Sequence, residues 1–518
     1  MAAKVSESLH ELIKYLTKSE KRYFKLFSAR HVVGEENNYV ILFDFVDSQT
    51  EYDEEAIFKH FKGQAFLNKF SITKKRLYDQ IINSLDSFHS NASIAAQIYK
   101  LLHSADILYN KSLYEQSRKQ LRSAEKLAVK HEMYNLLSEI SLKYKRLAEN
   151  NGVVDALEID KIMQTDLIAQ SQNFTYNIFW NLKSKLFALL HSKGISRTQA
   201  DLKEFEAIIS ELEIAKAKSE PTAASNYLYN HIYAAYYFAI GSFESCYNHL
   251  KENINLFEEL KNRIQEHPNQ YFSILTNAIY IANKLKKTAD SEALLLKLKE
   301  FNQEIENSNN QDLKIKLFAS SSSIELTILS MKGDLDKAFE VIPEIEKGLV
   351  DFESKLTSNR RAFLCFKIAC IHFINGDMHE ALKKINQILN DRDLDKQEDI
   401  LSFAQIINLL IHFEMENDQL LTYTIRNTQR FLKNKNRLYA FEEMFLKFLN
   451  KANLADNEVN QNEIIEDLYF EISRLKDDDF QKVAFEYFDF ASWAESKVHK
   501  KSLQKLIQHQ YELMQTDN

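Results

Sequence analysis

The residues that could carry chemistry in this chain do not assemble into a catalytic or cofactor-binding pattern. The sequence contains no G-x-x-x-x-G-K, G-x-G-x-x-G or G-x-S-x-G motif, so it lacks the loops that cradle phosphates and the elbow that presents a nucleophilic serine. His10-Glu11, His131-Glu132 and His379-Glu380 each lack the second histidine of the zinc motif H-E-x-x-H. We therefore expect no catalytic residue, no metal and no cofactor, and a protein that is not an enzyme.

The cysteines give no sign of a disulfide framework. There are three of them, Cys246, Cys365 and Cys370, without a C-x-x-C pair, which predicts buried thiols in a reducing compartment. No apolar run approaches the roughly 18–20 residues that span a bilayer, and the first residues do not resemble a secretory signal. The expected location is the cytoplasm, with no membrane partner.

Charge is informative in one stretch of the chain. The net charge of −8 argues against general affinity for nucleic acids over the whole surface. From Gln419 to Ala440, however, there is no acidic residue, and Arg426, Arg430 and Lys433 share one face of a predicted helix. Two interpretations remain open: a solvated face answered by acids on neighbouring helices, or a docking patch for an acidic partner or a phosphate backbone.

Aromatic residues crowd another predicted helix, which begins near Asn226. Tyrosine offers a large contact area and a hydroxyl for hydrogen bonding, and it is frequent where proteins bind one another. We expect a groove that takes an extended peptide or a partner helix to use residues of this helix, although half of the aromatic side chains must pack inward. The candidate partner-binding residues are Tyr229, Tyr233, Tyr236 and Tyr237.

The elements that would position these side chains are marked by glycines. Five of the eight glycines fall at Gly152, Gly194, Gly241, Gly333 and Gly376, with gaps of 42, 47, 92 and 43 residues, and the gap of 92 is close to two periods. A glycine just past a helix end is the usual left-handed cap. A period of this length indicates stacked helical hairpins. Extrapolation predicts turns near 111, 152, 194, 241, 287, 333, 376 and 417.

Composition restricts the fold further. The chain of 518 residues has only 8 glycines and 3 prolines, too few for the many turns of a β protein. Its length exceeds what one compact core normally serves. The sequence therefore predicts an all-α fold, with about eight hairpins over residues 91–435.

Two units of the repeat carry a family resemblance. Gly376-Asp377-Met378-His379-Glu380-Ala381 and Gly333-Asp334-Leu335-Asp336-Lys337-Ala338 each place an apolar residue two positions after the glycine and a small residue five after it. This pattern resembles the tetratricopeptide repeat (TPR), in which small residues let the two helices of a hairpin approach closely. The resemblance implies a right-handed α-solenoid with a concave groove for a peptide. The period is longer than the usual 34 residues, and HEAT-type repeats, whose helices tend to carry a proline kink, are the structural alternative.

Residues 1–90 do not follow the repeat. They contain five predicted amphipathic helices, the last of which begins at Ser71 and loosely resembles the recognition helix of a helix-turn-helix. The candidate nucleic-acid contacts on it are Lys74, Lys75, Arg76 and Tyr78. The 13 basic and 13 acidic residues of this region give no net positive charge to support such a role.

Residues 436–518 are expected to form a helical cap, because the end of a solenoid needs an element with a polar outer face. A single last helix is expected to carry an apolar stripe from Phe480 to Val498. These helices also resemble the C-terminal region of an uncharacterised bacterial family of helical-repeat proteins, a resemblance that implies no activity.

Two functions follow as expectations. The first is a cytoplasmic scaffold or adaptor that binds a protein or peptide through a TPR-like groove. The alternative is a transcriptional regulator that joins an N-terminal helix-turn-helix-like region to a TPR-like sensor. The sequence names neither the partner nor the oligomeric state.

Overall fold

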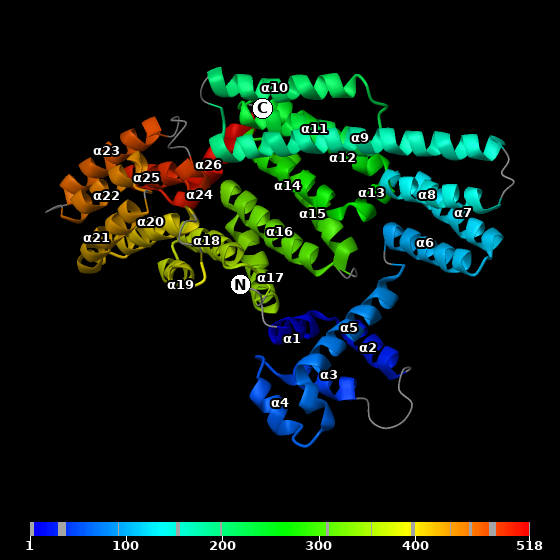
Figure 1. The fold of residues 1–518 in the computed structure, drawn as a ribbon. Coiled ribbons are helices and arrows are strands. Elements are labelled where there is room, and N and C mark those ends of the chain that lie inside the picture. The colour runs from blue at the N-terminus through cyan, green and yellow to red at the C-terminus, as the bar shows by residue number, and fades with distance from the viewer. Residues whose placement is uncertain are drawn as a thin grey trace. The chain divides into compact units, whose positions relative to one another are not determined.

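A computed structural model describes residues 5–29, 38–91, 93–151, 156–196, 199–306, 310–353, 355–394, 399–435, 437–454, 458–475 and 483–516. Every regular element in these ranges is a helix (Figure 1). The all-α prediction is therefore confirmed for the described part of the chain.

The N-terminal helices surround a core of their own. They are α1 (Val5–Tyr15), α2 (Lys18–Ala29), α3 (Asn38–Ser48), α4 (Glu54–His60), the 3-10 helix η1 (Ala65–Lys69) and α5 (Phe70–His89). Their buried apolar side chains run from Leu9 to Ile81 and pack together. All five amphipathic helices expected in this region are present.

The chain divides into two compact units. The first comprises Met1–Ser242 and Asn255–Glu266, and the second comprises Phe243–Ile254 and His267–Asn518. Helix α12 (Phe243–Glu259) therefore starts in the second unit and ends in the first.

Beyond α5, the first unit consists of helices that pack in sequence order. They are α6 (Ile94–Asn110), α7 (Tyr114–Lys130), α8 (Tyr134–Asn151), α9 (Ala156–Lys193), α10 (Gln199–Lys216), α11 (Ala223–Ala239) and the short α13 (Lys261–Glu266). Helix α9 contacts α8, α10 and α11. The glycine period predicts two helices here, the second helix of one hairpin and the first helix of the next hairpin. Helix α9 is instead a single helix of 38 residues. No glycine or proline occurs within it to end it.

The second unit has a more regular packing pattern. Its helices are α14 (Pro268–Lys284), α15 (Thr288–Glu306), α16 (Gln311–Lys332), α17 (Leu335–Asp351), α18 (Ser358–Asn375), α19 (Met378–Leu389), α20 (Asp399–Glu414), α21 (Asp418–Asn434), α22 (Ala440–Asn453), α23 (Glu458–Leu475), α24 (Val483–Tyr487), α25 (Phe490–Val498) and α26 (Leu503–Thr516). Each of α14, α16, α18 and α20 contacts the next even-numbered helix as well as the helix that follows it in the chain. This alternation is the packing expected of stacked hairpins.

Seven of the eight predicted turns lie between helices, and the eighth, near residue 152, falls outside the described residues. Four of the seven have a glycine in the left-handed conformation, at Gly194, Gly241, Gly333 and Gly376. The other three use Ser112, Lys286 and Glu416, whose φ angles are 60°, 59° and 55°. The backbone conformation therefore recurs where the glycine does not.

The same hydrogen bond closes turns of both kinds. After Gly376, the N–H of Asp377 donates to the carbonyl of His372 at 2.9 Å. After Lys286, the N–H of Lys287 donates to the carbonyl of Ala282, also at 2.9 Å. A bond that reaches back five residues past a left-handed residue is the Schellman motif, which satisfies a carbonyl left free at the helix end.

The small residues of the TPR-like pattern lie at the centre of the packing. Ala338 in α17 and Ala381 in α19 are both fully buried, and both belong to the large core of the second unit. A small residue at such a position lets two helices approach closely, as the sequence pattern predicts.

The C-terminal end differs from the expected cap. The sequence predicts a single helix across Phe480 to Val498; Phe480 lies outside the described residues, and from Val483 onward the segment is divided into α24 and α25, because Asp489 accepts a hydrogen bond from the N–H of Ser492 and caps a new helix. Helix α26 then returns to contact α16 and α18, and the side chain of Gln504 reaches Gly333, which lies 171 residues earlier in the chain. The end of the chain thus packs within the second unit as well as covering its last helices.

Candidate functional site

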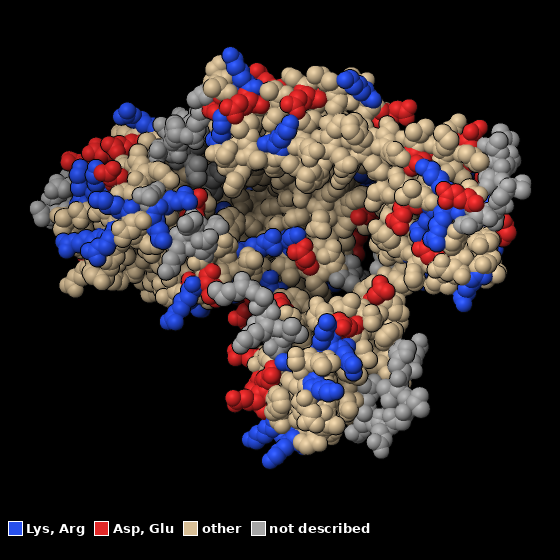
Figure 2. All heavy atoms as spheres, in the orientation of Figure 1, with Lys and Arg blue, Asp and Glu red and all other residues tan. Residues whose placement is uncertain are grey.

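The cations predicted on α21 form an exposed stripe. Arg426, Arg430 and Lys433 are exposed, and within the described ranges none of them makes an ion pair. The opposite face of the helix is buried through Leu421, Ile425, Thr428 and Leu432. Tyr423, whose side chain is 66% exposed, lies on the same outward face. Figure 2 shows Lys and Arg gathered over the part of the surface where Figure 1 places α21.

A neighbouring cation shows what a compensated charge looks like here. The guanidinium of Arg437 lies 2.5 Å from the carboxylate of Asp399, at the start of α20. The stripe of α21 has no such counterpart among the described acids, so its charge faces solvent.

The four predicted tyrosines lie together on α11, and two of their four hydroxyls form hydrogen bonds within the protein. The hydroxyls of Tyr229 and Tyr233 both donate to Glu213 of α10, at 2.9 and 2.8 Å. The ammonium of Lys216 lies 3.3 Å from the centre of the Tyr229 ring. Burial and the hydrogen bond to Glu213 raise the pKa of Tyr233 well above its ordinary value. These contacts fix the tyrosine cluster against α10.

The predicted nucleic-acid residues of α5 separate into two pairs. Lys74 is buried, with its ammonium 2.7 Å from the carboxylate of Glu54 and 4.7 Å from the centre of the Phe70 ring. Tyr78 packs against the core of the N-terminal helices. Lys75 and Arg76 are exposed. Of these candidate nucleic-acid contacts, Lys75 and Arg76 are therefore accessible to a ligand, and Lys74 is not.

A second cationic stripe, on α7, is absent from the sequence predictions. Lys119, Arg122, Lys126 and Lys130 are all exposed, and none makes an ion pair within the described part of the chain. Their spacing of three, four and four residues is the signal that could have revealed a shared helix face.

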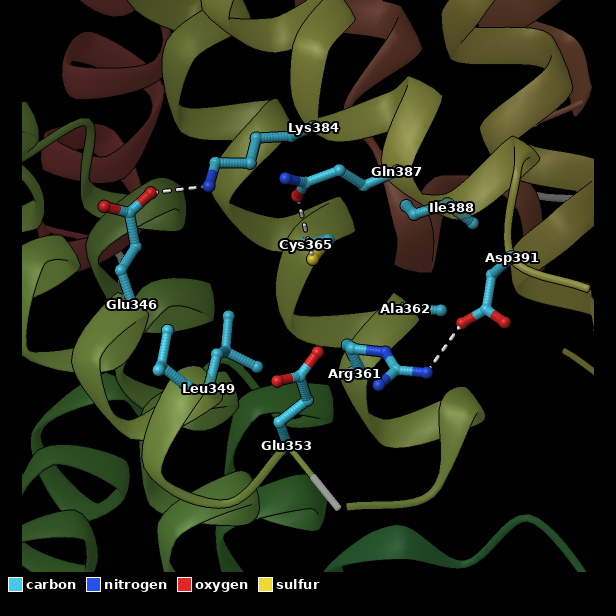
Figure 3. A pocket seen from close by; sticks show the side chains of 11 residues that line it. Glu346, Leu349, Glu353, Arg361, Ala362, Cys365, Lys384, Gln387, Ile388 and Asp391 are labelled. Carbon is cyan, nitrogen blue, oxygen red and sulfur yellow. Dashed lines mark hydrogen bonds and ion pairs between the residues drawn. The ribbon is translucent and has the colours of Figure 1, made fainter. Parts of the chain in front are cut away.

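A hollow of about 580 Å³ opens between α17, α18 and α19 (Figure 3). Lys384 pairs with Glu346 at 2.5 Å, and Arg361 pairs with Asp391 at 2.9 Å. The thiol of Cys365 faces Gln387, and burial raises the pKa of that thiol. A protonated thiol is a poor nucleophile, and both cations of the hollow are already paired. The hollow thus offers no assembled catalytic group.

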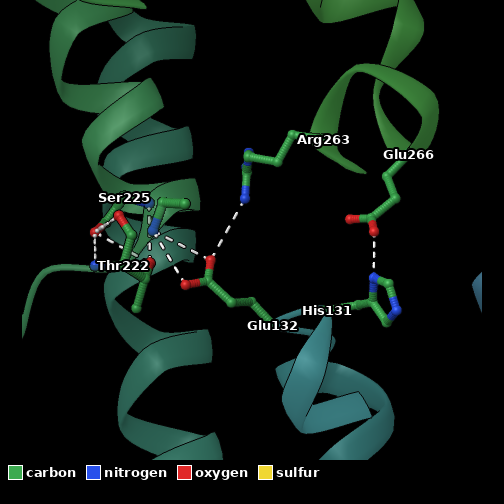
Figure 4. A network of polar contacts seen from close by, with 7 residues as sticks. His131, Glu132, Thr222, Ser225, Arg263 and Glu266 are labelled. Carbon is green, nitrogen blue, oxygen red and sulfur yellow. Dashed lines mark hydrogen bonds and ion pairs between the residues drawn. The ribbon is translucent and has the colours of Figure 1, made fainter. Parts of the chain in front are cut away.

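A buried polar network in the first unit also has a structural explanation (Figure 4). The carboxylate of Glu132 accepts a hydrogen bond from the backbone N–H of Ala223, at 3.1 Å, and lies 3.4 Å from the guanidinium of Arg263. His131 contacts Glu266 beside it. An acid at the start of a helix is stabilised by the helix dipole. The network therefore braces the turn between α7 and α8 against the start of α11 and against α13.

The described residues show neither a cluster of metal ligands nor a helix suited to span a membrane. No three His, Cys, Asp or Glu side chains in the described ranges are placed to share a metal ion. None of the helices found there is both long and apolar enough to cross a bilayer. Comparison of the chain with protein-family models, with curated proteins and with solved structures found no match.

Proposed function

We propose that this protein is a non-enzymatic cytoplasmic scaffold, built from TPR-like hairpins in a right-handed solenoid, that binds an acidic segment of a protein partner. The observation that supports it is the outward face of α21, where Tyr423, Arg426, Arg430 and Lys433 are exposed and the three cations lack ion pairs among the described residues. Tyrosine and arginine are the residue types enriched at the centre of protein interfaces.

The helix itself favours this use. The buried residues of α21 are anchored by α20 and α22, so the cations are presented from a packed element rather than from a loop. Exposed cations attract an acidic segment and speed its association, and the attraction weakens as salt screens it. The α11 tyrosines are a less favourable surface, because Glu213 already accepts hydrogen bonds from two of the four hydroxyls.

The proposal is tested by reversing the charge of the stripe. A full-length chain with Arg426→Glu, Arg430→Glu and Lys433→Glu is used beside wild type to capture proteins from nuclease-treated cytosol and to bind a labelled glutamate-rich peptide. We expect the peptide affinity to fall at least tenfold, because three attractions become repulsions. The proteins held by the wild type should be lost from the variant in the same experiment.

The matched control reverses three other lysines of the second unit, Lys337, Lys347 and Lys383, each exposed and the first and last paired with acids of their own helices. It changes the net charge by the same amount and should retain binding. An unchanged peptide affinity in the α21 variant, or an equal loss in the control, would show that the stripe is not a docking site.

A further inference from the structure

Helix α5 has one face in the core and one in solvent. Phe70, Thr73, Leu77 and Ile81 are buried on the inner face of this 20-residue helix. The outer face of its first half carries Ser71, Ile72, Lys75, Arg76 and Asp79, which line a shallow hollow of the surface. Ile72 is 50% exposed at the centre of this charged face.

The charges near this face are not balanced locally. Residues 56–78 contain no acid, and they carry Lys59, Lys62 and Lys69 in addition to the three consecutive cations of α5. These three lysines are exposed, like Lys75 and Arg76, and within the described ranges none of the five makes an ion pair.

Several acids of the domain are paired with cations away from this face, whereas Asp79 lies on the outer face of α5 itself. On α3, Asp47 and Asp44 pair with Lys21 and Lys25 of α2, at 2.5 and 2.6 Å. Glu54 holds the buried Lys74. The equal numbers of acids and bases in residues 1–90 therefore conceal one face on which five exposed cations outnumber the single acid, Asp79.

The cations of α4 and η1 lie near the start of α5. The rings of Phe58 in α4 and Phe70 in α5 are 5.1 Å apart, and the Lys74–Glu54 pair joins the same two helices. Lys59 follows Phe58 directly, and Lys69 directly precedes α5. An exposed helix start is thus flanked by cations from the elements that precede it.

We propose that this face, made of Lys59, Lys62, Lys69, Ile72, Lys75 and Arg76 and named here the α5 face, binds duplex DNA, independently of the α21 stripe. The major groove of B-form DNA admits an α-helix, whose first residues reach base edges while flanking cations contact phosphates. An exposed isoleucine suits the methyl group of thymine. Duplex RNA fits less well, because its major groove is too deep and narrow for side chains to read.

The test measures the affinity of the full-length chain for a labelled duplex about three helical turns long. If all five cations meet phosphates, the slope of log affinity against log salt is about −4 to −5, and the affinity falls several-hundredfold between about 50 and 200 mM salt. Lys75→Glu with Arg76→Glu should weaken binding at least tenfold and reduce the slope by about 2.

The control reverses Lys18 and Arg22 of α2, which are exposed in the same domain, and should change affinity much less. A second variant, Lys74→Gln, should lower the melting temperature because it leaves Glu54 without its buried partner, yet change DNA affinity less than the double variant does. It separates a residue that supports the fold from residues that contact the ligand.

Four outcomes would overturn the proposal. The first is no binding at about 50 mM salt. The second is binding that survives the double variant, which would assign the DNA to α7 or α21. The third is a loss of equal size in the α2 control. The fourth is tighter binding to another ligand than to duplex DNA. Tighter binding to duplex RNA would make the occupant an RNA, and tighter binding to polyglutamate, with the same dependence on Lys75 and Arg76, would make it an acidic protein.

Discussion

Histidine side chains packed inside this protein make its stability depend on pH, and His231 is the one with the largest effect. His231 of α11 stacks between Phe187 and Tyr227, with ring centres 5.4 and 5.5 Å away. Burial, together with the positive charge of Lys183, lowers the pKa of His231 to about 4. The imidazole is therefore neutral in the folded protein at pH values where the unfolded chain, with a pKa near 6.5, already binds a proton.

The sign of the effect follows from that difference. A depressed pKa gives stability that is fully present above about pH 6.5 and is lost as the pH falls toward 4. Between pH 7 and pH 5 we expect wild type to lose about 1–2 kcal/mol more than His231→Phe, which cannot bind the proton. Urea unfolding of both proteins across this range measures it. Parallel curves for the two proteins would show that His231 does not cause the loss.

Neighbouring residues with the same charge can have opposite roles, and the sequence alone does not separate them. Lys74 and Lys75 are adjacent and both basic, but the helical period places Lys74 on the face that carries Thr73 and Leu77. The period predicts that α5 has a buried face. It does not predict that Glu54, 20 residues earlier, supplies the carboxylate that lets a lysine be buried there. That contact depends on tertiary packing.

At the scale of elements, the turns offer a direct test of what the glycines do. Lys286 holds a φ of 59°, a conformation that costs an L-residue roughly 1–2 kcal/mol. Lys286→Gly should therefore stabilise the protein by about 0.5–1 kcal/mol, because glycine adopts this φ without strain although it loses more chain entropy. Lys286→Ala is the control, since it removes the side chain but keeps the strained Cβ, and it should give no such gain.

The reverse change should cost different amounts at two equivalent turns. At Gly376 an added Cβ would meet no atom within 4 Å, so Gly376→Ala suffers only from its φ of 88°. At Gly333 the Cβ would come within 2.8 Å of Gln508, so Gly333→Ala should be the more destabilising. Denaturant unfolding of the four variants decides both points. A Lys286→Gly protein less stable than Lys286→Ala would refute the explanation of the turns.

The glycine period predicts where helices end better than where they continue. It places seven turns correctly, and in six of them the next helix follows the left-handed residue at once, for example after Asp334, which caps α17; the exception is Gly194, because α10 begins only at Gln199. It fails at α9, where nothing in the chain ends the helix between Ala156 and Lys193. Three turns also lack glycine, and their positions follow only from the regularity of their neighbours.

At the scale of the whole molecule, charge is distributed by helix face more than by region. The net charge of −8 hides exposed cationic faces on α5, α7 and α21 that lack ion pairs among the described residues. Sequence windows found the α21 stripe because no acid interrupts it, and missed the α7 stripe because Glu115 precedes its cations and Glu125 lies between them. The period of the helix, not the local sum of charges, decides which side chains share a surface.

The return of α26 is the long-range feature that no periodic signal indicates, and it can be tested by itself. The side-chain amides of Gln504 and Gln508 both donate to the carbonyl of Gly333, at 3.1 and 2.9 Å. Gln504→Ala with Gln508→Ala removes both bonds while keeping good helix formers, so the second unit should lose about 1–3 kcal/mol. Hydrogen exchange at the turn between α16 and α17 should quicken, whereas the helices of the first unit should be unaffected.

Lys505→Ala with His509→Ala is the control for this prediction, because it changes two exposed residues of the same helix, and it should leave stability and exchange unchanged. Equal stabilities and equal exchange rates for the two double variants would mean that α26 does not hold this turn.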